Sequence, residues 1–326
     1  TITIASRGEY AGYISFMKNK FWAGGLCYPY TVKDTSLYIT KYLFYYLKHK
    51  EKYIMDTMVA RGSIPALNKK DIEKIEIPIP PIAIQEEIVN ILDTFTELEA
   101  ELEAELVLRE KQYEYYRDKL LTFSPDDSRV KWVSLSELGI FIRGNGLQKK
   151  DFTSEGVGCI HYGQIYTYYK TFTDKTKSFV SKQLANKLKK AKPKDLIIAT
   201  TSENVRDVAK AVAWLGDEEI CISGDACIFR HNQNSKYMSY LFQTQSFFKH
   251  KKKYVTGTKV IRINNKDLGK FYFPIPQLEE QERIVNILDK FESLVNDISI
   301  GLPAEINARQ QQYKYYRNKL LSFNKI

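Results

Sequence analysis

The feature that most restricts the fold of this chain is an internal repeat. The hexapeptide IVNILD occurs at residues 88–93 and again at residues 284–289, which is 196 positions later. Upstream of it, LNKKDIEKIEIPIP (67–80) matches INNKDLGKFYFPIP (263–276) at the same offset. Repetition at a fixed period indicates that one structural unit occurs twice. We therefore predict two equivalent modules, related most simply by a pseudo-two-fold axis.

Each copy has the same internal order. A region rich in Gly, Thr, Tyr and β-branched residues comes first, and this composition is typical of strands and loops. It ends in a Pro-x-Pro strand, at residues 78–80 and 274–276, and acidic and amide residues follow within a few positions. Such residues favour the start of a helix because they complement the helix dipole. The phrases QYEYYRDKLLTF (112–123) and QYKYYRNKLLSF (312–323) then close the two helices.

The spacing of apolar residues in the first helix predicts a coiled-coil seam. From Ile88 to Phe123 they recur at steps of three and four positions, which is the pattern of helices that supercoil around a partner. The literal repeat LEAELEAEL (98–106) adds one further step of four. Such a step is a stutter in the heptad pattern.

The second helix carries the same seam with an interruption. Its apolar steps run from Ile284 to Ile298 and stop at GLPAE (301–305). There, Gly301 can end one helix and Pro303 can begin the next. Because each long helix needs an apolar partner, we expect the two helices to pair with each other in antiparallel orientation. About 42 residues at ~1.5 Å per residue give a spacer of roughly 60 Å.

These elements predict an α+β fold in which two mixed α/β domains are separated by a pair of long antiparallel coiled-coil helices. The predicted boundaries are 1–80 for the first mixed domain, 81–123 for spacer helix 1, 124–276 for the second mixed domain and 277–326 for spacer helix 2.

The composition fits a folded and basic protein. With 326 residues, 44% of them hydrophobic, the chain can build two cores. Its formal net charge of +10 is compatible with a polyanionic partner. The 23 Tyr and 17 Phe are interleaved with Lys, Asn and Gln. This mixture suits a surface that contacts bases and phosphates, and it equally suits aromatic β-sheet cores.

Several classes of protein are disfavoured. No run approaches the ~18 apolar residues of a membrane span, and the N-terminal residues lack the features of a signal peptide, so we expect a cytoplasmic protein without a membrane partner. The cysteines, which lack CxxC spacing, are expected to be reduced core residues, and the histidines lack metal-ligand spacing. These residues are Cys27, Cys159, Cys221 and Cys227, and His49, His161, His231 and His250.

In combination, the duplicated PIP…IVNILD and QYxYYRxKLL phrases, the GLPAEI break and the LEAELEAEL spacer resemble the specificity subunit of type I restriction-modification systems, which act in defence against foreign DNA. The resemblance covers nearly the whole chain. It implies two target-recognition domains that bind a bipartite double-stranded DNA sequence, and docking of two adenine-N6 methyltransferase subunits. Restriction subunits, which form the ATP-dependent endonuclease, join the full complex. It also implies that the subunit is not catalytic and that S-adenosylmethionine, ATP and Mg are bound by the partner subunits.

Motifs of the catalytic partners are missing from the sequence. It contains no Asp/Asn-Pro-Pro-aromatic tetrapeptide, no Gly-x-Gly-x-x-Gly and no Walker lysine motif. Two alternatives stay open: an unrecognised DNA methyltransferase or nuclease, and a coiled-coil scaffold that binds only proteins.

Candidate DNA-binding residues lie in loop-like stretches that mix hydrogen-bonding, cationic and stacking side chains, although each could equally be an ordinary solvated loop residue. In the second copy they are Arg143, Asn145, Gln148, Lys149, Lys150, His161, Tyr162, Gln164, Tyr166, Lys170, Thr201, Ser202, Asn204, Arg206, Lys251, Lys252, Thr256, Thr258 and Lys259. In the first copy they are Ser6, Arg7, Arg61 and Ser63. The candidates for docking the partner subunits are Tyr115, Arg117, Tyr315 and Arg317.

The first copy lacks a counterpart of WVSLSELGIFIRGNGLQKKDF (132–152). We therefore expect domain 1 to be incomplete, with the N-terminal part missing. Without the strands that would cover its core, Ile2, Ile4, Phe21 and Trp22 are expected to be exposed.

Overall fold

The computed structural model describes residues 1–297 and 299–323, and the chain forms two compact units. Unit 1 comprises Thr1–Leu108 together with Asn296–Ile326, and unit 2 comprises Arg109–Val295. Helix α3 (Ile82–Leu120) contributes residues to both units. Ile298 of the predicted seam lies outside the described residues.

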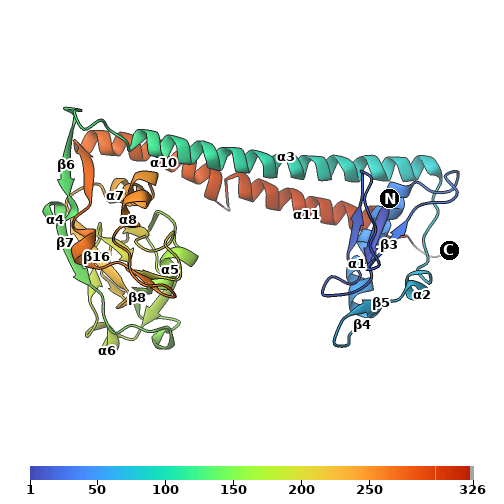
Figure 1. Cartoon of the computed structure of the whole chain (residues 1–326), viewed down its shortest axis with the longest axis horizontal. Coiled ribbons are helices and arrows are strands. Elements are labelled where there is room, and N and C mark those ends of the chain that lie inside the picture. The colour runs from blue at the N-terminus through green and yellow to red at the C-terminus, as the bar shows by residue number, and fades with distance from the viewer. Residues whose placement is uncertain (298, 324–326) are drawn as a thin grey trace. The chain divides into compact units, whose positions relative to one another are not determined.

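Unit 1 is a small sheet covered by helices (Figure 1). Its strands and helices are β1 (Ile2–Ala5), β2 (Ile14–Phe16), β3 (Cys27–Tyr30), α1 (Thr40–Thr57), β4 (Val59–Ala60), β5 (Ala66–Leu67), α2 (Lys69–Ile72), the first part of α3 and α11 (Leu302–Leu321). The three-stranded sheet has the order β2-β1-β3, and both pairs are antiparallel.

The expectation that Ile2 and Ile4 are exposed is wrong. Both side chains are completely buried, and they pack in one cluster with Leu47 and Ile54 of α1. The physical reason is that α1 lays its apolar face on the sheet, so the alternate residues of β1 that point toward the helix are covered. The expectation holds for Trp22, which is 93% exposed, whereas Phe21 is half-buried.

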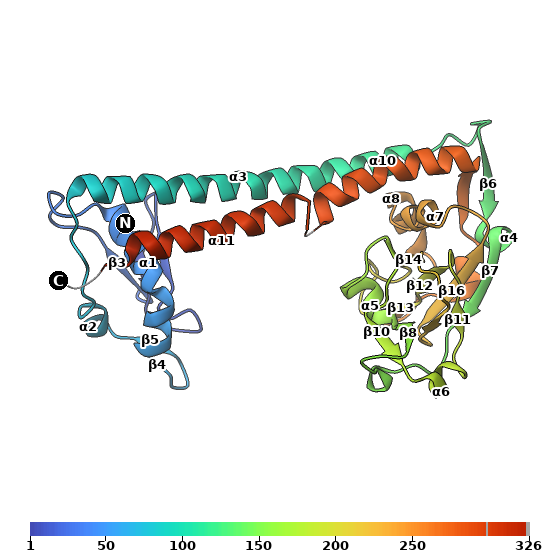
Figure 2. The same cartoon turned by 180° about the vertical axis from the view of Figure 1, so that it is seen from behind.

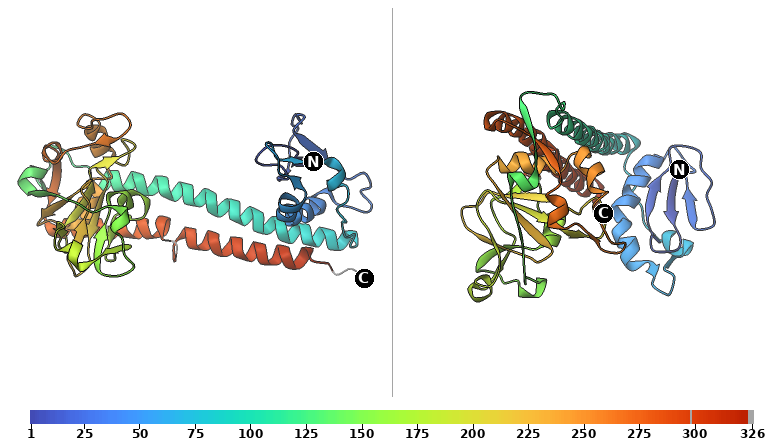
Figure 3. Two further views of the ribbon diagram at one scale, coloured as in Figure 1. Left: turned by 90° about the horizontal axis from the view of Figure 1, so that it is seen from below. Right: turned by 60° about the vertical axis from the view of Figure 1, so that its left-hand side comes forward.

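A helical cluster joins α1 to the two long helices of unit 1. Its buried residues are Tyr42, Tyr45, Tyr46, Ile88, Val89, Leu92 and Leu321. Phe95 of α3 stacks on Tyr316 late in α11, whereas Glu99, one turn later in α3, accepts a hydrogen bond from Gln310, which comes earlier in α11. Figures 1 and 3 show α3 and α11 side by side. The order of these contacts makes the two helices antiparallel, as predicted.

Unit 2 is larger and contains more strands. It holds β6 (Val130–Ser134), α4 (Leu135–Leu138), β7 (Gly139–Arg143), the 3-10 helix η1 (Lys149–Asp151), β8 (Val157–Ile160), α5 (Tyr162–Thr167), β9 (Phe172–Thr173), β10 (Ser178–Val180), α6 (Lys182–Ala185), β11 (Lys190–Ala191), β12 (Leu196–Ala199), β13 (Thr201–Ser202), β14 (Ala211–Trp214), β15 (Ile220–Ile222), β16 (Ala226–His231), α7 (Ser235–Leu241), α8 (Gln245–Lys251), β17 (Ile261–Arg262), α9 (Asn265–Leu268), β18 (Tyr272–Pro276) and α10 (Leu278–Asn296).

The core of unit 2 lies between two sheets and a helical layer. The sheets have the orders β7-β16-β12-β14-β9 and β10-β8-β15-β11. Strands β12 and β14 are buried along their whole length, which is typical of strands covered on both faces. In Figure 2, α7 and α8 lie between α10 and these strands. The cysteines Cys159, Cys221 and Cys227 are buried free thiols in the sheets, and Cys27 of unit 1 is half-buried and also free.

The break predicted at GLPAE is confirmed. Helix α10 ends at Asn296 and α11 begins at Leu302, with a proline in its first turn. Gly301 is the N-cap residue of α11 rather than the end of α10. Proline fits there because the first turn of a helix needs no donor from that residue.

The same hydrogen bonds tie the long helix to the helix beneath it in each unit. In unit 2, Asp289 of α10 accepts from Lys236 at 2.6 Å and from Tyr240 at 2.7 Å. In unit 1, Asp93 of α3 accepts from Lys41 and Tyr45. This aspartate clamp has a signal in the sequence, because KYLFY (41–45) matches KYMSY (236–240).

A buried glutamine forms a second repeated anchor. The Gln85 side chain accepts from the Ile39 N–H and donates to the Pro80 carbonyl. Gln281 accepts from the Asn234 N–H and donates to the Pro276 carbonyl. The Pro-x-Pro segment, the start of the long helix and the underlying helix are therefore joined in the same way in both units.

We predict that Asp289→Ala lowers the free energy of unfolding by about 1.5–3 kcal/mol, because it removes charge-assisted hydrogen bonds from Lys236 and Tyr240. Urea unfolding followed by circular dichroism measures the change. Asp56→Ala is the control, since it breaks an exposed ion pair with Lys52 worth less than about 1 kcal/mol. Equal effects of the two substitutions would contradict a structural role for the clamp.

Candidate nucleic-acid interface

Two of the predicted DNA-binding stretches meet in unit 2. Strand β13 of TTSENVRD pairs antiparallel with β17 of VTGTKVIR, with Thr201 opposite Arg262. Thr256 and Arg262 exchange two backbone hydrogen bonds, of 2.9 and 2.8 Å, and so close a hairpin. Gly257 adopts φ +95° at its tip, and a Cβ there would lie 2.0 Å from the Val260 carbonyl oxygen. Only glycine fits this turn, which presents Thr258 and the neighbouring Lys259 to solvent.

The turn Ser223–Gly224–Asp225 holds the other predicted stretches next to this hairpin. Arg143 donates from Nε to the Gly224 carbonyl at 3.3 Å, and the Thr201 hydroxyl donates to Asp225 at 3.1 Å. The Tyr162 N–H donates to the Ser223 hydroxyl at 2.8 Å. This turn was missed in the sequence, although a glycine turn between the apolar runs ICI and ACIF is a recognisable signal.

The resulting surface carries cations, amides, hydroxyls and aromatic rings. Tyr162 and Tyr166 are half-buried with their rings edge to face at 6.2 Å, and burial raises the pKa of Tyr166 to about 12. The exposed candidates are Arg143, Gln148, Lys149, Lys150, Lys170, Asn204, Arg206, Lys252, Thr256, Thr258 and Lys259, and Arg262 is a further exposed cation that the sequence analysis did not include.

Two amide candidates are occupied by the protein's own hydrogen bonds. The Asn145 side chain donates to the Lys187 carbonyl at 2.9 Å and accepts from the Lys189 N–H at 2.6 Å. Buried Gln164 accepts from the His161 N–H at 2.9 Å and donates to the Ser178 hydroxyl at 2.8 Å. These side chains hold the loops in place, and their amides are not free to contact a base.

Four further candidates are either buried or hydrogen-bonded within their own loop. His161 is buried, accepts from the Gly163 N–H through Nδ1, and has its pKa lowered by burial and by nearby Lys149. Thr201 and Ser202 are buried within β13. Exposed Asn204 bonds to the backbone and side chain of Asp207. His161, Thr201 and Ser202 shape the loops, since buried side chains cannot reach a base edge.

The structure corrects the assignment of Lys251 as a phosphate contact. Its side chain is 3% exposed, and its ammonium donates to the Arg206 carbonyl at 2.7 Å and the Val208 carbonyl at 2.6 Å. Lys251 therefore ties α8 to the loop that follows β13. Lys252, the next residue, is exposed over the Phe248 ring.

Unit 1 contains the same hairpin arrangement. Strands β4 and β5 pair as a hairpin, and Ala66 of β5 forms a bridge with Arg7. Arg61 and Ser63 are exposed at its tip, and Arg7 is exposed beside it. Ser6 is buried, and its carbonyl accepts from the Leu67 N–H at 2.8 Å, so it serves the fold.

The predicted docking residues fall into two groups. Tyr115 in unit 2 and Tyr315 in unit 1 are each 60% exposed. The Arg117 guanidinium, in contrast, is buried over the Tyr113 ring and pairs with Asp118, and half-buried Arg317 lies over Tyr313. The assignment of Arg117 as a surface contact is corrected, because its alkyl chain and charge are enclosed by its own unit.

The cations that lie beside the exposed tyrosines are lysines rather than these arginines. The ammonium of Lys119 lies 5.7 Å from the centre of the Tyr115 ring, and that of Lys319 lies 6.0 Å from the centre of the Tyr315 ring. Each unit thus exposes one tyrosine and lysine pair of the same geometry.

Among residues 1–297 and 299–323, no cluster of three or more His, Cys, Asp or Glu side chains could hold a metal ion. No helix in the same residues is long and apolar enough to cross a membrane.

Comparison with known proteins decides the family. Residues 1–108 and 128–308 match the type I restriction modification DNA specificity domain. The chain belongs to this specificity family. Since the family match falls in two segments, the predicted internal repeat and the predicted family are confirmed.

Relatives extend the similarity over most of the specificity protein. The chain is 34% identical over 304 residues to the specificity subunit of a type I restriction enzyme of Escherichia coli, covering 90% of this chain and 73% of the relative. It is 32% identical over 326 residues to a putative type I restriction enzyme specificity subunit of Haemophilus influenzae, covering 95% and 79%.

Solved structures confirm the fold of the specificity protein. One similar chain comes from a structural study of complex assembly and conformational transition in the type I R-M system. It aligns with TM-score 0.66 and 16% identity, over 98% of this chain and 81% of the other. The S subunit from M. genitalium aligns with TM-score 0.57 and 17% identity, over 99% and 83%. The mixed α/β fold with long helices is therefore as predicted.

The buried ammonium of Lys251 predicts a pH effect on stability. Burial lowers its pKa from 10.5 to about 8, so the folded protein loses this proton at a lower pH than the unfolded chain does. Between these values the unfolded chain binds more protons, and stability rises with pH. Relative to Lys251→Met, the native protein should gain on the order of 3 kcal/mol across this range, at about 1.4 kcal/mol per pKa unit.

Urea unfolding of both proteins at pH 7, 8, 9 and 10 measures this difference. Lys252→Met is the matched control, because Lys252 is exposed and should show no such trend. A stability difference between native protein and Lys251→Met that is constant with pH would contradict the burial of a charged amine.

Proposed function

We propose that this specificity-family protein binds double-stranded DNA through the hairpin surface of each unit. The single observation that carries the proposal is the recurrence of one arrangement, a hairpin bridged to the segment after a buried strand, in both units. In both, exposed cations and hydroxyls occupy the hairpin tip or its flank. Two such surfaces on one chain suit a target of two half-sites, as in the bipartite sequence that the family resemblance implies.

On the larger surface, the roles divide by side-chain chemistry. Cations contact phosphates and provide affinity without sequence information, whereas amides and hydroxyls read base edges. Arg143, Lys252 and Lys259 are the proposed phosphate contacts, and Gln148 and Thr258 are proposed to face bases. Tyr162 and Tyr166 provide the rigid aromatic wall of the surface.

We further propose that the chain is not itself catalytic. Its role is to place two adenine-N6 methyltransferase subunits on the target, and restriction subunits join through them. The partners would supply the binding of S-adenosylmethionine, ATP and Mg, for which this sequence carries no motif. The exposed pairs of Tyr115 with Lys119 and Tyr315 with Lys319 are the proposed docking contacts.

Binding to DNA should depend steeply on salt, because each neutralised phosphate releases counterions. Lys252→Ala and Lys259→Ala should each weaken binding at every sequence and reduce the slope of log K against log salt by about 1. Fluorescence anisotropy with duplex DNA, using this protein assembled with its methyltransferase subunits, measures both quantities.

The matched control for these lysines is Lys290→Ala, an exposed lysine of α10. Its slope should equal that of the native protein. A complex that binds no DNA would favour the protein-only scaffold, and an unchanged slope in Lys252→Ala and Lys259→Ala would place the interface elsewhere.

Replacing both exposed tyrosines should weaken assembly. In the double variant Tyr115→Ala, Tyr315→Ala, the binding of each methyltransferase subunit is expected to lose about 1–2 kcal/mol, or roughly tenfold in affinity, because aromatic anchors at interfaces contribute this much. Co-purification and calorimetry with the methyltransferase subunit measure the loss. Trp22→Ala, which removes a 93% exposed ring elsewhere, should leave assembly unchanged, and an equal effect of both changes would reject this docking surface.

A further inference from the structure

The Pro-x-Pro strand of unit 2 has a partner strand. β18 pairs antiparallel with β6 in a two-stranded sheet, with Phe273 opposite Val133, Pro274 opposite Trp132 and Ile275 opposite Lys131. Proline has no N–H, so ladder hydrogen bonds can form only at the alternate residues, Phe273 and Ile275. The two prolines therefore restrict the backbone hydrogen bonds between β18 and β6 to Phe273 and Ile275 of β18.

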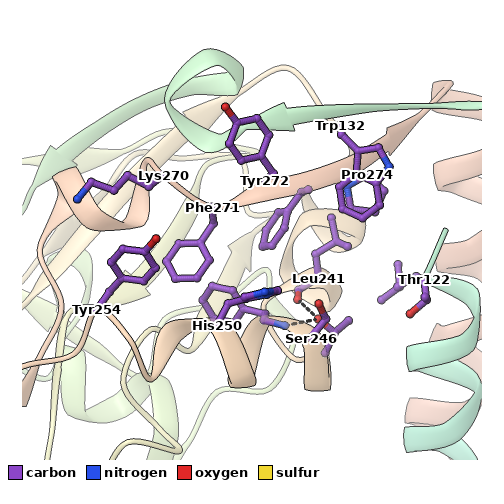
Figure 4. Close-up of a pocket in the computed structure, with 14 residues that line it drawn as sticks. Thr122, Trp132, Leu241, Ser246, His250, Tyr254, Lys270, Phe271, Tyr272 and Pro274 are labelled. Atoms are coloured by element: carbon purple, nitrogen blue, oxygen red, sulfur yellow. Dashed lines mark hydrogen bonds between the residues drawn. The ribbon is translucent and has the colours of Figure 1, made fainter. Parts of the chain in front are cut away.

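Side chains add to this pairing on one face of the sheet. Trp132 lies beside Pro274 in Figure 4, at the edge of a cavity of about 290 Å³. Leu241, Phe247 and Phe271 also line the cavity. In unit 2, β6 thus supplies both a hydrogen-bonding edge and an aromatic side chain.

The equivalent segment of unit 1, Glu76–Pro80, is fixed in the same way from the inside. The carbonyls of Glu76 and Pro78 accept from Tyr46 and Tyr42 of α1, and the Pro80 carbonyl accepts from Gln85. In unit 2, Tyr237 donates to Pro274 and Gln281 donates to Pro276 in the same manner. The segment is therefore held extended with its alternate residues facing outward.

The outward side of this segment has no strand partner within the part of the chain that the structure describes, where the Ile77 carbonyl accepts a long hydrogen bond, of 3.5 Å, from the Tyr38 hydroxyl. No described strand pairs with residues 76–80, and the N–H groups of Ile77 and Ile79 donate no hydrogen bond among the described residues. The Ile79 side chain is 55% exposed. An edge with unpaired donors at alternate positions is a template for strand addition.

A cavity adjoins the open edge at the position that corresponds to the one beside Trp132. It has a volume of about 590 Å³, against 290 Å³ in unit 2. Tyr46, Tyr53, Met58, Ile77, Pro78 and Phe323 are among its lining residues. Lys50, Lys74 and Glu76 line it as well, so aromatic rings and cations are combined, and both can attract an aromatic side chain.

We propose that Glu76–Pro80 is a strand-accepting edge whose ligand is an extended polypeptide with the pattern of β6. The strand would add antiparallel, with backbone hydrogen bonds to Ile77 and Ile79 and an aromatic side chain opposite Pro78 that enters the cavity. Main-chain bonds then give affinity and the aromatic pocket gives selectivity, as in other cases of strand addition. The site binds protein, and it is separate from the proposed DNA contacts of the hairpin tip.

The chemistry of the ligand follows from β6, which is the strand paired with the equivalent edge in unit 2. The β6 of this chain is already paired with β18, so the strand for unit 1 is a second segment of the same chemistry. A synthetic peptide SRVKWVSLSEL, the sequence of residues 128–138, serves as the probe.

Titration of the labelled peptide with the full chain, followed by fluorescence anisotropy, tests the proposal. Saturable binding is expected. N-methylation at Val133 should weaken it about tenfold, because this N–H would bond to the Ile77 carbonyl, which would otherwise keep only the long hydrogen bond from the Tyr38 hydroxyl. N-methylation at Trp132 is the matched control, since that N–H faces away from the ladder and binding should persist. Absence of binding, or equal effects of the two methyl groups, would overturn the proposal.

Variants of the protein show which unit holds the peptide. Ile79→Pro removes one donor from the open edge and should weaken binding about tenfold, whereas Ile79→Ala keeps the donor and should retain it. Binding that is insensitive to Ile79→Pro would indicate exchange with β6 in unit 2 and would reject the site. Self-association of the chain that the peptide does not reverse would assign the edge to a second copy and would also overturn the proposal.

Discussion

Each unit depends on a carboxylate of a long helix that accepts hydrogen bonds from a lysine and a tyrosine of the helix beneath it. Asp93 and Asp289 sit in this position, on the face of the long helix that also buries Leu92 and Leu288. Apolar burial alone allows the long helix to pack at several rotations about its axis. A lysine and a tyrosine one turn apart on the helix beneath can both reach its carboxylate at only one of these rotations. The clamp therefore fixes the rotation of the helix, and Gln85 and Gln281 fix where it starts.

The hairpin surfaces follow from this frame. The long helix fixes the Pro-x-Pro segment, and the hairpin and the short helix after it come just before that segment in each copy. Rigid secondary structure thus carries loops whose sequences differ between the copies, such as RGSI (61–64) and GTKV (257–260). This division, in which a repeated frame carries variable loops, is the usual way for a fold to hold a binding function.

How far the sequence predicts this structure depends on whether the signal is local. The seam, the Gly301 and Pro303 break and the repeat are properties of short stretches, and all of them appear in the structure. The burial of Ile2 and Ile4 depends on a helix some 40 residues later, so a pattern in the strand alone did not reveal it. Lys251 and Asn145 look like surface residues in sequence, and only the fold brings carbonyls to their polar atoms. Tertiary contacts therefore decide which polar loop residues remain available for a ligand.

Glu292 in unit 2 introduces a difference between two otherwise matched frames. It is buried, and it accepts from the Thr171 hydroxyl at 2.7 Å, which links α10 to the loop before β9, and it shares the single hydroxyl proton of Tyr240 with Asp289. The equivalent residue of unit 1 is Thr96, whose hydroxyl donates to the Leu92 carbonyl of its own helix. A recombinant that places the recognition residues of unit 2 on the helix of unit 1 would leave Thr171 without its acceptor. The aspartate clamp is therefore the same in both modules, but the residue one turn after it in the long helix differs. A chimaera that carries the recognition residues of unit 2 on the helix of unit 1 needs Thr96→Glu in that helix.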